Sequence, residues 1–450
     1  MFYRSTKGEV KLRNVLVISL LFGQTEITGV GRLRGLIKYL PEFGWNPVVL
    51  TAKSSMLVNK QNNIFETPYE DTIVLWKKRM GLPLNIPFKK YYNFPTNKQK
   101  KTLIDKIIYF WFEIFTYPHP TINWSISAIE KGEELLKEKH FDAIISSMSP
   151  CTSHIVASHI VTKELVNKKI NRKKIPWVAD FRDLWTQNHY NIHSSIRGFF
   201  EKRLELNTLS SANALTTVSQ PLSDKLKELH KNKKVYTITN GYDPEQINPG
   251  ISVTKKFTIS YTGTIYKGRQ DPEPLFRVLK VLIDENKIDP AIIEVNFFGY
   301  DEGWLISDIK KYQLENIIQI HGKISREESI QKQRESQVLL LLTWNDPKEK
   351  GIYTGKIFDY LAARRPILAL GLKGSVVTDL LNQTQAGENV TSDAEIKSQI
   401  LKFYREFNEN GFVKYSGILS EIEKYSHREM AKKFAEVLLE ICESKNNLNI

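Results

Sequence analysis

Short apolar, β-branched runs alternate with segments of helical periodicity along nearly the whole chain. In the first half these runs predict strands at residues 15–19, 47–50, 143–147, 177–180, 215–218 and 235–238. A similar series in the second half predicts strands at residues 258–261, 293–298, 317–321, 338–343 and 367–370. Helical segments such as 30–43 and 129–138 fall between the strands. This alternation predicts an α/β protein with doubly wound parallel sheets, because parallel strands need helical crossovers.

A polar stretch with two prolines and two glycines, residues 241–250, separates the two series of strands. A chain of 450 residues is also too long for one ordinary core. We therefore predict a first domain at 1–243, a linker at 244–256, a second domain at 257–420 and a C-terminal helical segment at 421–450. Because such sheets bind ligands beyond the carboxyl ends of their strands, the two domains are expected to face each other across a cleft.

One segment, residues 351–366, combines a glycine-broken loop with a short amphipathic helix and a buried strand. It places Lys356 in the first helical turn, where a cation opposes the positive end of the helix dipole. A bound anion would compensate for this repulsion, so the segment predicts a phosphate site. Thr354 is placed to cap the helix, and Asp359, about one turn on, faces the same side as Lys356. The alternative is an ordinary capped helix whose lysine extends into water.

The spacing of glycines excludes two well-known nucleotide loops. A P-loop has four residues between its glycines, whereas three residues separate Gly351 from Gly355. A dinucleotide fingerprint that starts at Gly29 and Gly31 would need a third glycine where Arg34 stands, so NAD binding is rejected. Gly29 and Gly31 either allow backbone amides to approach a ligand or form a tight turn between strand and helix.

A second cationic loop, residues 262–272, follows the first strand of the second domain. Gly263 makes this loop permissive, and Lys267 and Arg269 supply charge that suits a diphosphate. We expect the loop to enter the same site as Lys356, because both lie at the ligand-binding edge of one domain.

Two carboxylates and a guanidinium follow a buried strand of the first domain, at Asp180, Arg182 and Asp183. Their spacing suits a clamp for sugar hydroxyls or a general base. The alternative is an ion network that the three side chains satisfy among themselves.

The formal net charge of +14 calls for an anionic partner, such as a nucleic acid, an acidic membrane surface or a phosphorylated substrate. Basic and aromatic residues are interleaved at about residues 76–117, which suits a lipid headgroup layer. A core helix beside a solvated loop and a groove for single-stranded nucleic acid are the alternatives.

Neither a spanning apolar run nor a secretory signal is present, so we expect a cytoplasmic protein, peripheral on the inner face of the membrane. The two cysteines form no metal-ligand spacing, and no metal is expected.

Several segments together resemble the retaining glycosyltransferases of family 4, in particular the branch found in bacterial surface-polysaccharide clusters. The matching segments are residues 29–31, 39–45, 177–185, 239–242, 261–266 and 353–367. The resemblance spans nearly the whole chain and implies the GT-B fold, in which two Rossmann-like domains face each other. It also implies that the last helix crosses back onto the first domain.

The resemblance assigns roles to individual residues. Lys356, Thr354 and the helix amides would hold the donor phosphates, and Asp359 would bind the ribose hydroxyls. The full set of expected donor-binding residues is Gly29, Gly31, Gly263, Thr264, Lys267, Arg269, Tyr353, Thr354, Gly355, Lys356 and Asp359. The expected catalytic residues are Asp180, Asp183 and Lys356, with Arg32, Arg182 and Trp185 on the acceptor side.

The sequence departs from the family pattern at three places. Gly351 stands where the first acid of the Glu-x7-Glu motif is expected, although Glu349 is close. Thr264 occupies a place where many relatives have arginine, which leaves Lys267 or Arg269 as its replacement. The loop 149–152 lacks a histidine that is common in the family. These departures also fit an inactive member.

The resemblance implies metal-independent transfer, with retention, of a sugar such as a hexose from a nucleotide-diphosphate sugar. The acceptor would be a saccharide or a lipid-linked molecule in the synthesis of a cell-surface polysaccharide such as capsule or lipopolysaccharide. An anionic membrane surface is an expected partner and nucleic acid is not. The alternatives are a sugar-nucleotide epimerase of the same two-domain shape and a non-catalytic protein that binds sugar nucleotides or nucleic acid.

Overall fold

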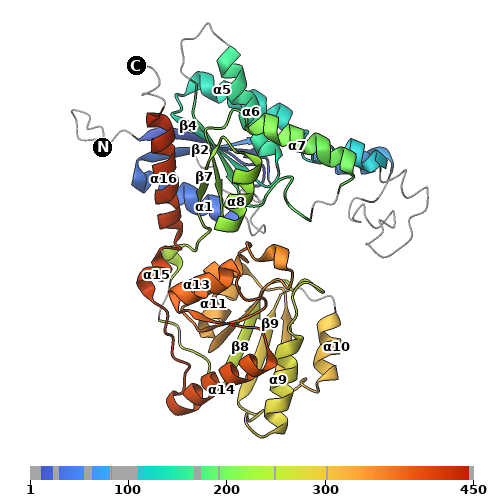
Figure 1. The fold of residues 1–450 in the computed structure, drawn as a ribbon, viewed down its shortest axis with the longest axis vertical. Helices are drawn as coiled ribbons and strands as arrows, with labels where there is room; N and C mark the ends of the chain where they lie inside the picture. The colour runs from blue at the N-terminus through green and yellow to red at the C-terminus, as the bar shows by residue number, and fades with distance from the viewer. Residues whose placement is uncertain are drawn as a thin grey trace, which may run out of the picture. The chain divides into compact units, whose positions relative to one another are not determined.

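The computed structural model describes residues 12–23, 30–54, 63–81, 83, 110–166, 174–190, 193–247, 250–299 and 303–444 (Figure 1). The chain forms two compact units. The first unit comprises residues 1–218, 222–238 and 431–450, and the second comprises residues 219–221 and 239–430. The N-terminal part of the first unit thus ends at residue 238, shortly before the predicted linker at 244–256. Gly29 and most of the predicted basic and aromatic stretch, residues 84–109, lie outside the described residues.

The first unit is built on a seven-stranded parallel sheet with the strand order β3-β2-β1-β4-β5-β6-β7. Its strands are β1 (Arg13–Ile18), β2 (Trp45–Ala52), β3 (Ile64–Thr67), β4 (Ala143–Met148), β5 (Trp177–Phe181), β6 (Ala214–Thr217) and β7 (Lys234–Thr237). Central strands such as β4 and β5 are buried along their whole length, as expected for a sheet covered on both faces.

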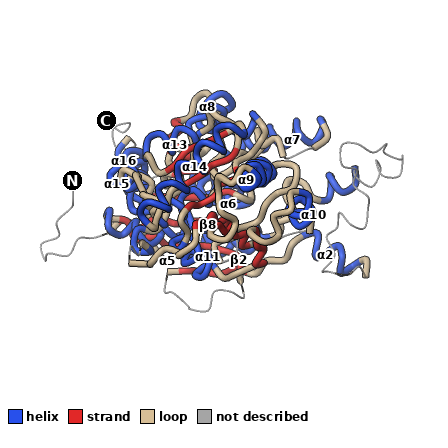
Figure 2. The backbone as a smooth tube through the Cα atoms, turned by 90° about the horizontal axis from the view of Figure 1, so that it is seen from below, coloured by secondary structure: helices blue, strands red, loops and turns tan. Residues whose placement is uncertain are grey.

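Helices accompany these strands, and Figure 2 colours the strands red and the helices blue. They are α1 (Val30–Tyr39), α2 (Thr72–Arg79), α5 (Trp124–Glu138), α6 (Thr152–Val166), α7 (Ser195–Leu209), α8 (Gln220–Leu229) and the C-terminal α16 (His427–Glu443). The predicted α-helix 30–43 ends early, at Tyr39, because Pro41 cannot continue it. A 3-10 turn that contains Pro41, η1 (Leu40–Phe43), follows, and Gly44 closes it at a φ of 85°. From Ala431 onward α16 belongs to the first unit, where Glu440 pairs with Lys234 at 2.7 Å.

The second unit has a six-stranded parallel sheet with the order β10-β9-β8-β11-β12-β13. Its strands are β8 (Phe257–Thr262), β9 (Ile293–Phe298), β10 (Ile318–Gly322), β11 (Val338–Leu342), β12 (Ile367–Leu370) and β13 (Gly387–Val390). Its helices are η2 (Pro244–Gln246), α9 (Glu273–Asp284), α10 (Trp304–Lys311), α11 (Arg326–Glu335), η3 (Pro347–Glu349), α12 (Lys356–Ala363), α13 (Val376–Thr384), α14 (Asp393–Asn410) and α15 (Leu419–Glu423).

Strand β11 shows how both faces of this sheet are covered. Leu340 and Leu342 belong to a core that includes side chains of α9 and α14, whereas Leu339 and Leu341 pack with α12 and α13. Alternate residues therefore enter opposite cores, as the two-residue period of a strand requires. The prediction of doubly wound parallel sheets is confirmed in both units. In the described part of the chain, no helix is both long and apolar enough to cross a lipid bilayer.

Candidate functional site

Three strands of the second unit, β8, β9 and β10, end in glycines whose backbones approach each other closely. Gly263 N donates a hydrogen bond to Phe298 O at 2.6 Å, and Gly299 N donates to Gly322 O at 2.7 Å. Gly263 and Gly299 have φ values of +106° and +156°, and a Cβ on Gly299 would collide with the carbonyl group of Gly263. A side chain at position 299 is therefore excluded at the carboxyl edge of the sheet, where open α/β sheets bind ligands.

Lys356, the first residue of α12, extends across Gly263. A Cβ on Gly263 would lie 2.6 Å from Lys356 Cε and 3.2 Å from its Nζ. The same Nζ lies 5.2 Å from the ring centre of Tyr261, whose side chain is almost fully buried. We call this group of Tyr261, Gly263 and Lys356 the cationic corner. The loop after β8 and the loop before α12 meet here, as the sequence predicted.

The electrostatics of the cationic corner favour a bound anion. Burial lowers the pKa of Lys356 to about 8, although the nearby Asp359 acts to raise it. Among the described residues no carboxylate forms an ion pair with Lys356, and the closest acid along the helix, Asp359, is paired elsewhere. The ammonium group also lies at the N-terminus of α12, where the helix dipole is positive. Lys356 thus has no ion-pair partner within the described chain, although Asp359 supplies a carboxylate in the first turn of α12.

The start of α12 differs slightly from the prediction. Gly355 occupies the position before the helix and offers no side-chain cap. The Thr354 hydroxyl nevertheless accepts a hydrogen bond from Lys356 N at 3.3 Å, and the Thr354 carbonyl accepts one from Ile357 N at 3.2 Å. Thr354 thus stabilises the first turn from one residue further upstream. Tyr353 is half-buried and its ring lies 5.5 Å from that of Phe358.

Asp359 is held by a residue that sequence reasoning did not find. Arg326, the first residue of α11, donates to Asp359 Oδ1 through Nη2 at 3.1 Å. The arginine side chain is 59% exposed and the carboxylate 28% exposed, so the pair lies at the surface. Burial raises the pKa of Asp359, while Arg326 and Lys356 act to lower it. No motif marks Arg326, although its place after β10 puts it at the same sheet edge.

The other cations of the loop after β8 lie over indole rings. Lys267 Nζ is 5.6 Å from the ring centre of Trp304, and Arg269 Cζ is 5.9 Å from that of Trp344. Tyr266, half exposed, stacks on Trp344 with ring centres 5.5 Å apart. These contacts hold the two predicted cations beside aromatic surfaces instead of directly beside Lys356. Sequence reasoning missed both tryptophans. Trp304 follows β9 and Trp344 follows β11, so both belong to the same sheet edge.

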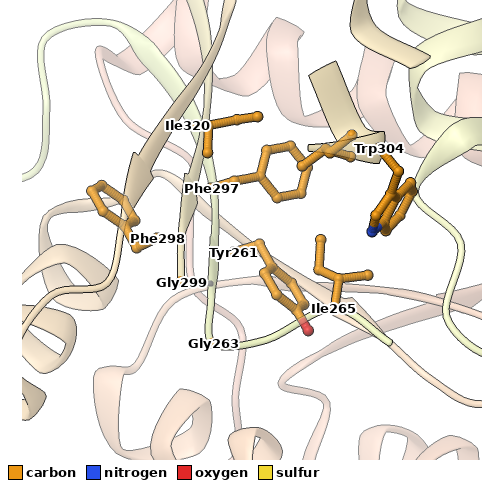
Figure 3. A pocket seen from close by; sticks show the side chains of 9 residues that line it. Tyr261, Gly263, Ile265, Phe297, Phe298, Gly299, Trp304 and Ile320 are labelled. Carbon is orange, nitrogen blue, oxygen red and sulfur yellow. The ribbon is translucent and has the colours of Figure 1, made fainter. Parts of the chain in front are cut away.

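A hollow opens next to the cationic corner (Figure 3). Its lining is apolar and aromatic apart from two glycines, and consists of Tyr261, Gly263, Ile265, Phe297, Phe298, Gly299, Trp304, Leu305 and Ile320. Thr264, beside this lining, accepts a hydrogen bond from the Tyr261 hydroxyl at its backbone oxygen, at 2.9 Å. The hollow has room for only about one water molecule, so the cationic corner itself, and not the hollow, is the candidate place for a ligand.

Neither Gly351, at the place of the family's first acid, nor the nearby Glu349 offers an exposed carboxylate. Glu349, which ends η3, is only 3% exposed, and Gly351 is buried. Neither residue therefore presents an acidic group at the surface of the second unit.

In the first unit, Asp180 belongs to a buried ion network. Arg32 donates to it through Nη2 at 3.0 Å and through Nε at 3.3 Å, and both side chains are at most 1% exposed. Ser147 and Thr216 donate through their hydroxyls at 2.9 and 2.8 Å. Burial alone would raise the pKa of Asp180, but the ion pair with Arg32 and these hydrogen bonds outweigh it and lower the pKa.

This burial corrects part of the predicted acceptor side. Asp180, Arg32 and Trp185 are at most 3% exposed, which argues against direct contact with an acceptor. The alternative network of Asp180, Arg182 and Asp183 does not form either, because Arg32 is the cation of Asp180. Arg182 pairs instead with Asp183 at 3.2 Å, and these two side chains are 25% and 44% exposed.

The glycines after β1 have no demonstrated steric role. A Cβ on Gly31 would meet no atom within 4 Å, so packing does not require glycine there. Gly29 lies outside the described residues.

Residues 31–246, just under half of the chain, match the family model of Glycosyltransferase Family 4. No curated protein sequence matches the chain significantly. Among solved structures, sucrose-phosphate synthase from Thermosynechococcus elongatus is similar over 96% of this chain and 100% of its own, with 12% identity and a TM-score of 0.60.

Two further solved structures are similar at 12% identity, each over 95% of this chain and 99% of its own. HepE from Anabaena, in complex with UDP-glucose, has a TM-score of 0.57. The lipopolysaccharide outer core galactosyltransferase WaaB has a TM-score of 0.54. These likenesses show that the chain has the GT-B fold, with two Rossmann-like domains.

Proposed function

We propose that this protein is a glycosyltransferase that moves a hexosyl group, with retention and without a metal ion, from a nucleotide-diphosphate sugar to an acceptor. The observation that carries the proposal is the cationic corner, where a partly buried ammonium and a helix N-terminus point to an anionic ligand. The match of residues 31–246 to a glycosyltransferase family and the GT-B fold support it.

The chemistry of transfer explains why such a corner is useful. The bond between the sugar's anomeric carbon and the diphosphate oxygen breaks, and its electron pair leaves with the diphosphate. The acceptor oxygen forms the new bond to the anomeric carbon, and the proton of its hydroxyl passes to the departing diphosphate oxygen. Lys356 and the amides of α12 would stabilise the charge that develops on the diphosphate, and a site with little water makes this stabilisation stronger. Gly263 would let the phosphates approach the lysine closely.

The donor's nucleoside would occupy the surface beside the corner. Asp359 would accept hydrogen bonds from the ribose hydroxyls, which requires Arg326 to release at least one carboxylate oxygen. HepE, a protein of the same fold, was solved with UDP-glucose, which makes uridine diphosphate sugars the first donors to test.

The acceptor side is part of the same proposal. Asp183 and Arg182 remain its candidate residues, whereas Asp180 and Arg32 would position the strand end from within the core. We propose a saccharide or lipid-linked acceptor in the synthesis of a cell-surface polysaccharide, at the inner face of the cytoplasmic membrane. The relation of fold to WaaB, a lipopolysaccharide galactosyltransferase, supports this choice.

Product analysis with radiolabelled sugar nucleotides tests the proposal. Label is expected to pass from one donor to an acceptor supplied by membrane extract, in the wild type and in Lys310→Ala, but not in Lys356→Ala. Lys310, an exposed lysine in the last turn of α10, is the matched control for loss of one charge. Conversion of the donor into another sugar nucleotide without acceptor would identify an epimerase instead. Equal transfer by Lys356→Ala and the wild type would refute the role of the corner.

A further inference from the structure

An apolar surface of unusual composition lies on the first unit. Seven large apolar side chains, each between 41% and 66% exposed, occupy the helical segment 110–115 and the first half of α7. They are Phe110, Trp111, Ile114, Phe115, Ile196, Phe199 and Phe200, and we call them the aromatic surface. Single exposed apolar residues are common, but a gathering of this kind marks an interaction site. The residues of α7 were not part of the predicted basic and aromatic stretch.

The two elements that carry the aromatic surface are held together by buried polar contacts. Arg197 of α7 donates to the carbonyl oxygen of Glu113 at 3.0 Å and to Thr116 Oγ1 at 2.9 Å. It also pairs with Glu201 at 2.7 Å. The Glu113 carboxylate accepts a hydrogen bond from Ser194 N, just before α7, at 2.7 Å. The segment 110–115 is therefore fixed to α7, which extends from the sheet of the first unit (Figure 1).

Aromatic contacts continue this surface toward α2. Trp111 stacks on Phe115 with ring centres 5.6 Å apart, and Phe115 lies 4.3 Å from Trp76 of α2. On α7, Phe199 meets Phe200 edge to face at 5.6 Å. Within each element, the exposed rings are thus packed against each other and do not project singly into solvent.

The charges beside the aromatic surface are cationic. The acids of the two elements, Glu113, Glu201 and Glu205, are at most 5% exposed, and the first two take part in the contacts described above. Lys202 and Arg203 are exposed one turn after Phe199 and Phe200, and Arg79 is exposed at the end of α2. A partner that covers this surface therefore meets an apolar centre with a positive rim.

We infer that the aromatic surface docks the first unit on a membrane that contains anionic lipids. Aromatic rings beside Lys and Arg are the side chains that enter the headgroup layer, and the cations are attracted by its negative charge. A second copy of this chain fits less well, since two positive rims would repel each other. The inference rests on the proposed function, because it explains how the acceptor-side unit would reach a lipid-linked acceptor. Binding to vesicles can nevertheless be measured without sugar transfer.

Vesicle flotation with the full-length protein tests the inference. The wild type is expected to float with vesicles of phosphatidylcholine and phosphatidylglycerol, more weakly with phosphatidylcholine alone, and less as salt is raised. Phe199→Glu with Phe200→Glu should lower the partition coefficient about tenfold or more. Phe412→Glu, at a phenylalanine of the second unit that is 49% exposed, is the matched control and should bind as the wild type does.

Three results would overturn the inference. The wild type could fail to bind anionic vesicles, the double variant could bind them undiminished, or Phe412→Glu could lose as much binding as the double variant. A concentration-dependent dimer that the double variant abolishes, together with no vesicle binding, would instead identify a second copy as the occupant. Circular dichroism and thermal unfolding, compared with those of the wild type, show whether the first unit of the double variant is folded. Vesicle binding without sugar transfer would contradict the proposed function alone.

Discussion

The substitution Asp180→Asn should strongly lower the free energy of unfolding of the first unit, because it leaves the Arg32 guanidinium buried without its counter-charge. Both side chains are at most 1% exposed, so water cannot replace the lost carboxylate. Four hydrogen bonds end on Asp180, two from Arg32 and one each from Ser147 and Thr216. An asparagine side chain keeps only one acceptor oxygen. Its NH2 group would face the N–H and O–H donors that bind the carboxylate in the wild type.

The expected loss follows from this geometry. Breaking a buried ion pair by removing one partner costs about 3–5 kcal/mol, since an uncompensated charge stays in the core. Asp183→Asn is the matched control, because Asp183 is 44% exposed and its pair with Arg182 is worth about 0–1 kcal/mol. The free energy of unfolding of each variant, from denaturant titration followed by circular dichroism, checks both values.

The pH dependence of stability gives a second test of the same ion pair. The pKa of Asp180 is lower in the folded protein than its usual value, so its contribution to stability is present above that usual value. The contribution is lost as pH falls through the folded pKa, and this part of the acid destabilisation should be absent in Asp180→Asn. A variant as stable as the wild type that nevertheless loses sugar transfer would refute the structural interpretation and restore a catalytic one.

Three further predictions concern the second unit. Affinity for a nucleoside diphosphate should fall as pH rises through about 8. Burial lowers the pKa of Lys356 to about 8, and only the charged form of the lysine attracts the anion. Calorimetry that finds the same affinity across this pH range would contradict the prediction. Gly263→Ala should weaken this binding about tenfold or more, since the new Cβ would lie 2.6 Å from Lys356 Cε. Gly268→Ala is the control and should bind as the wild type does, because Gly268 also has a positive φ but a Cβ there would meet no atom within 4 Å. Arg326→Ala should strengthen binding by up to about fivefold, because it frees Asp359 from a surface pair worth at most about 1 kcal/mol; weaker binding would mean that Arg326 itself holds the ligand.

The central strands of both sheets could be predicted because their apolar character is local. The edge strands β3 and β13 could not, since Ile64–Thr67 and Gly387–Val390 are four residues long and only one residue of β13 is buried. Each forms because a neighbouring strand offers its hydrogen-bonding edge, as Ile367–Leu370 does for β13. Such pairing depends on tertiary contacts, which a window of sequence does not contain.

The candidate site shows the same division. Lys356 stood out in the sequence because the conflict between its charge and the helix dipole is local. The cation of Asp180 did not, because Arg32 is 148 residues away along the chain and the nearer Arg182 seemed its natural partner by spacing. Arg326 reaches Asp359 only through the crossover from β10 to β11, so no spacing rule could indicate that pair.

Titration calorimetry of uridine diphosphate into the wild type, Lys356→Ala and Lys310→Ala tests the central claim most directly. The three proteins are expected to show the same circular dichroism, so that a difference in affinity reports the site alone. We predict that the wild type and Lys310→Ala bind equally and that Lys356→Ala binds at least about tenfold more weakly, since a charged contact to phosphate is lost. Equal binding by Lys356→Ala and the wild type would contradict the claim that the cationic corner holds the donor's diphosphate.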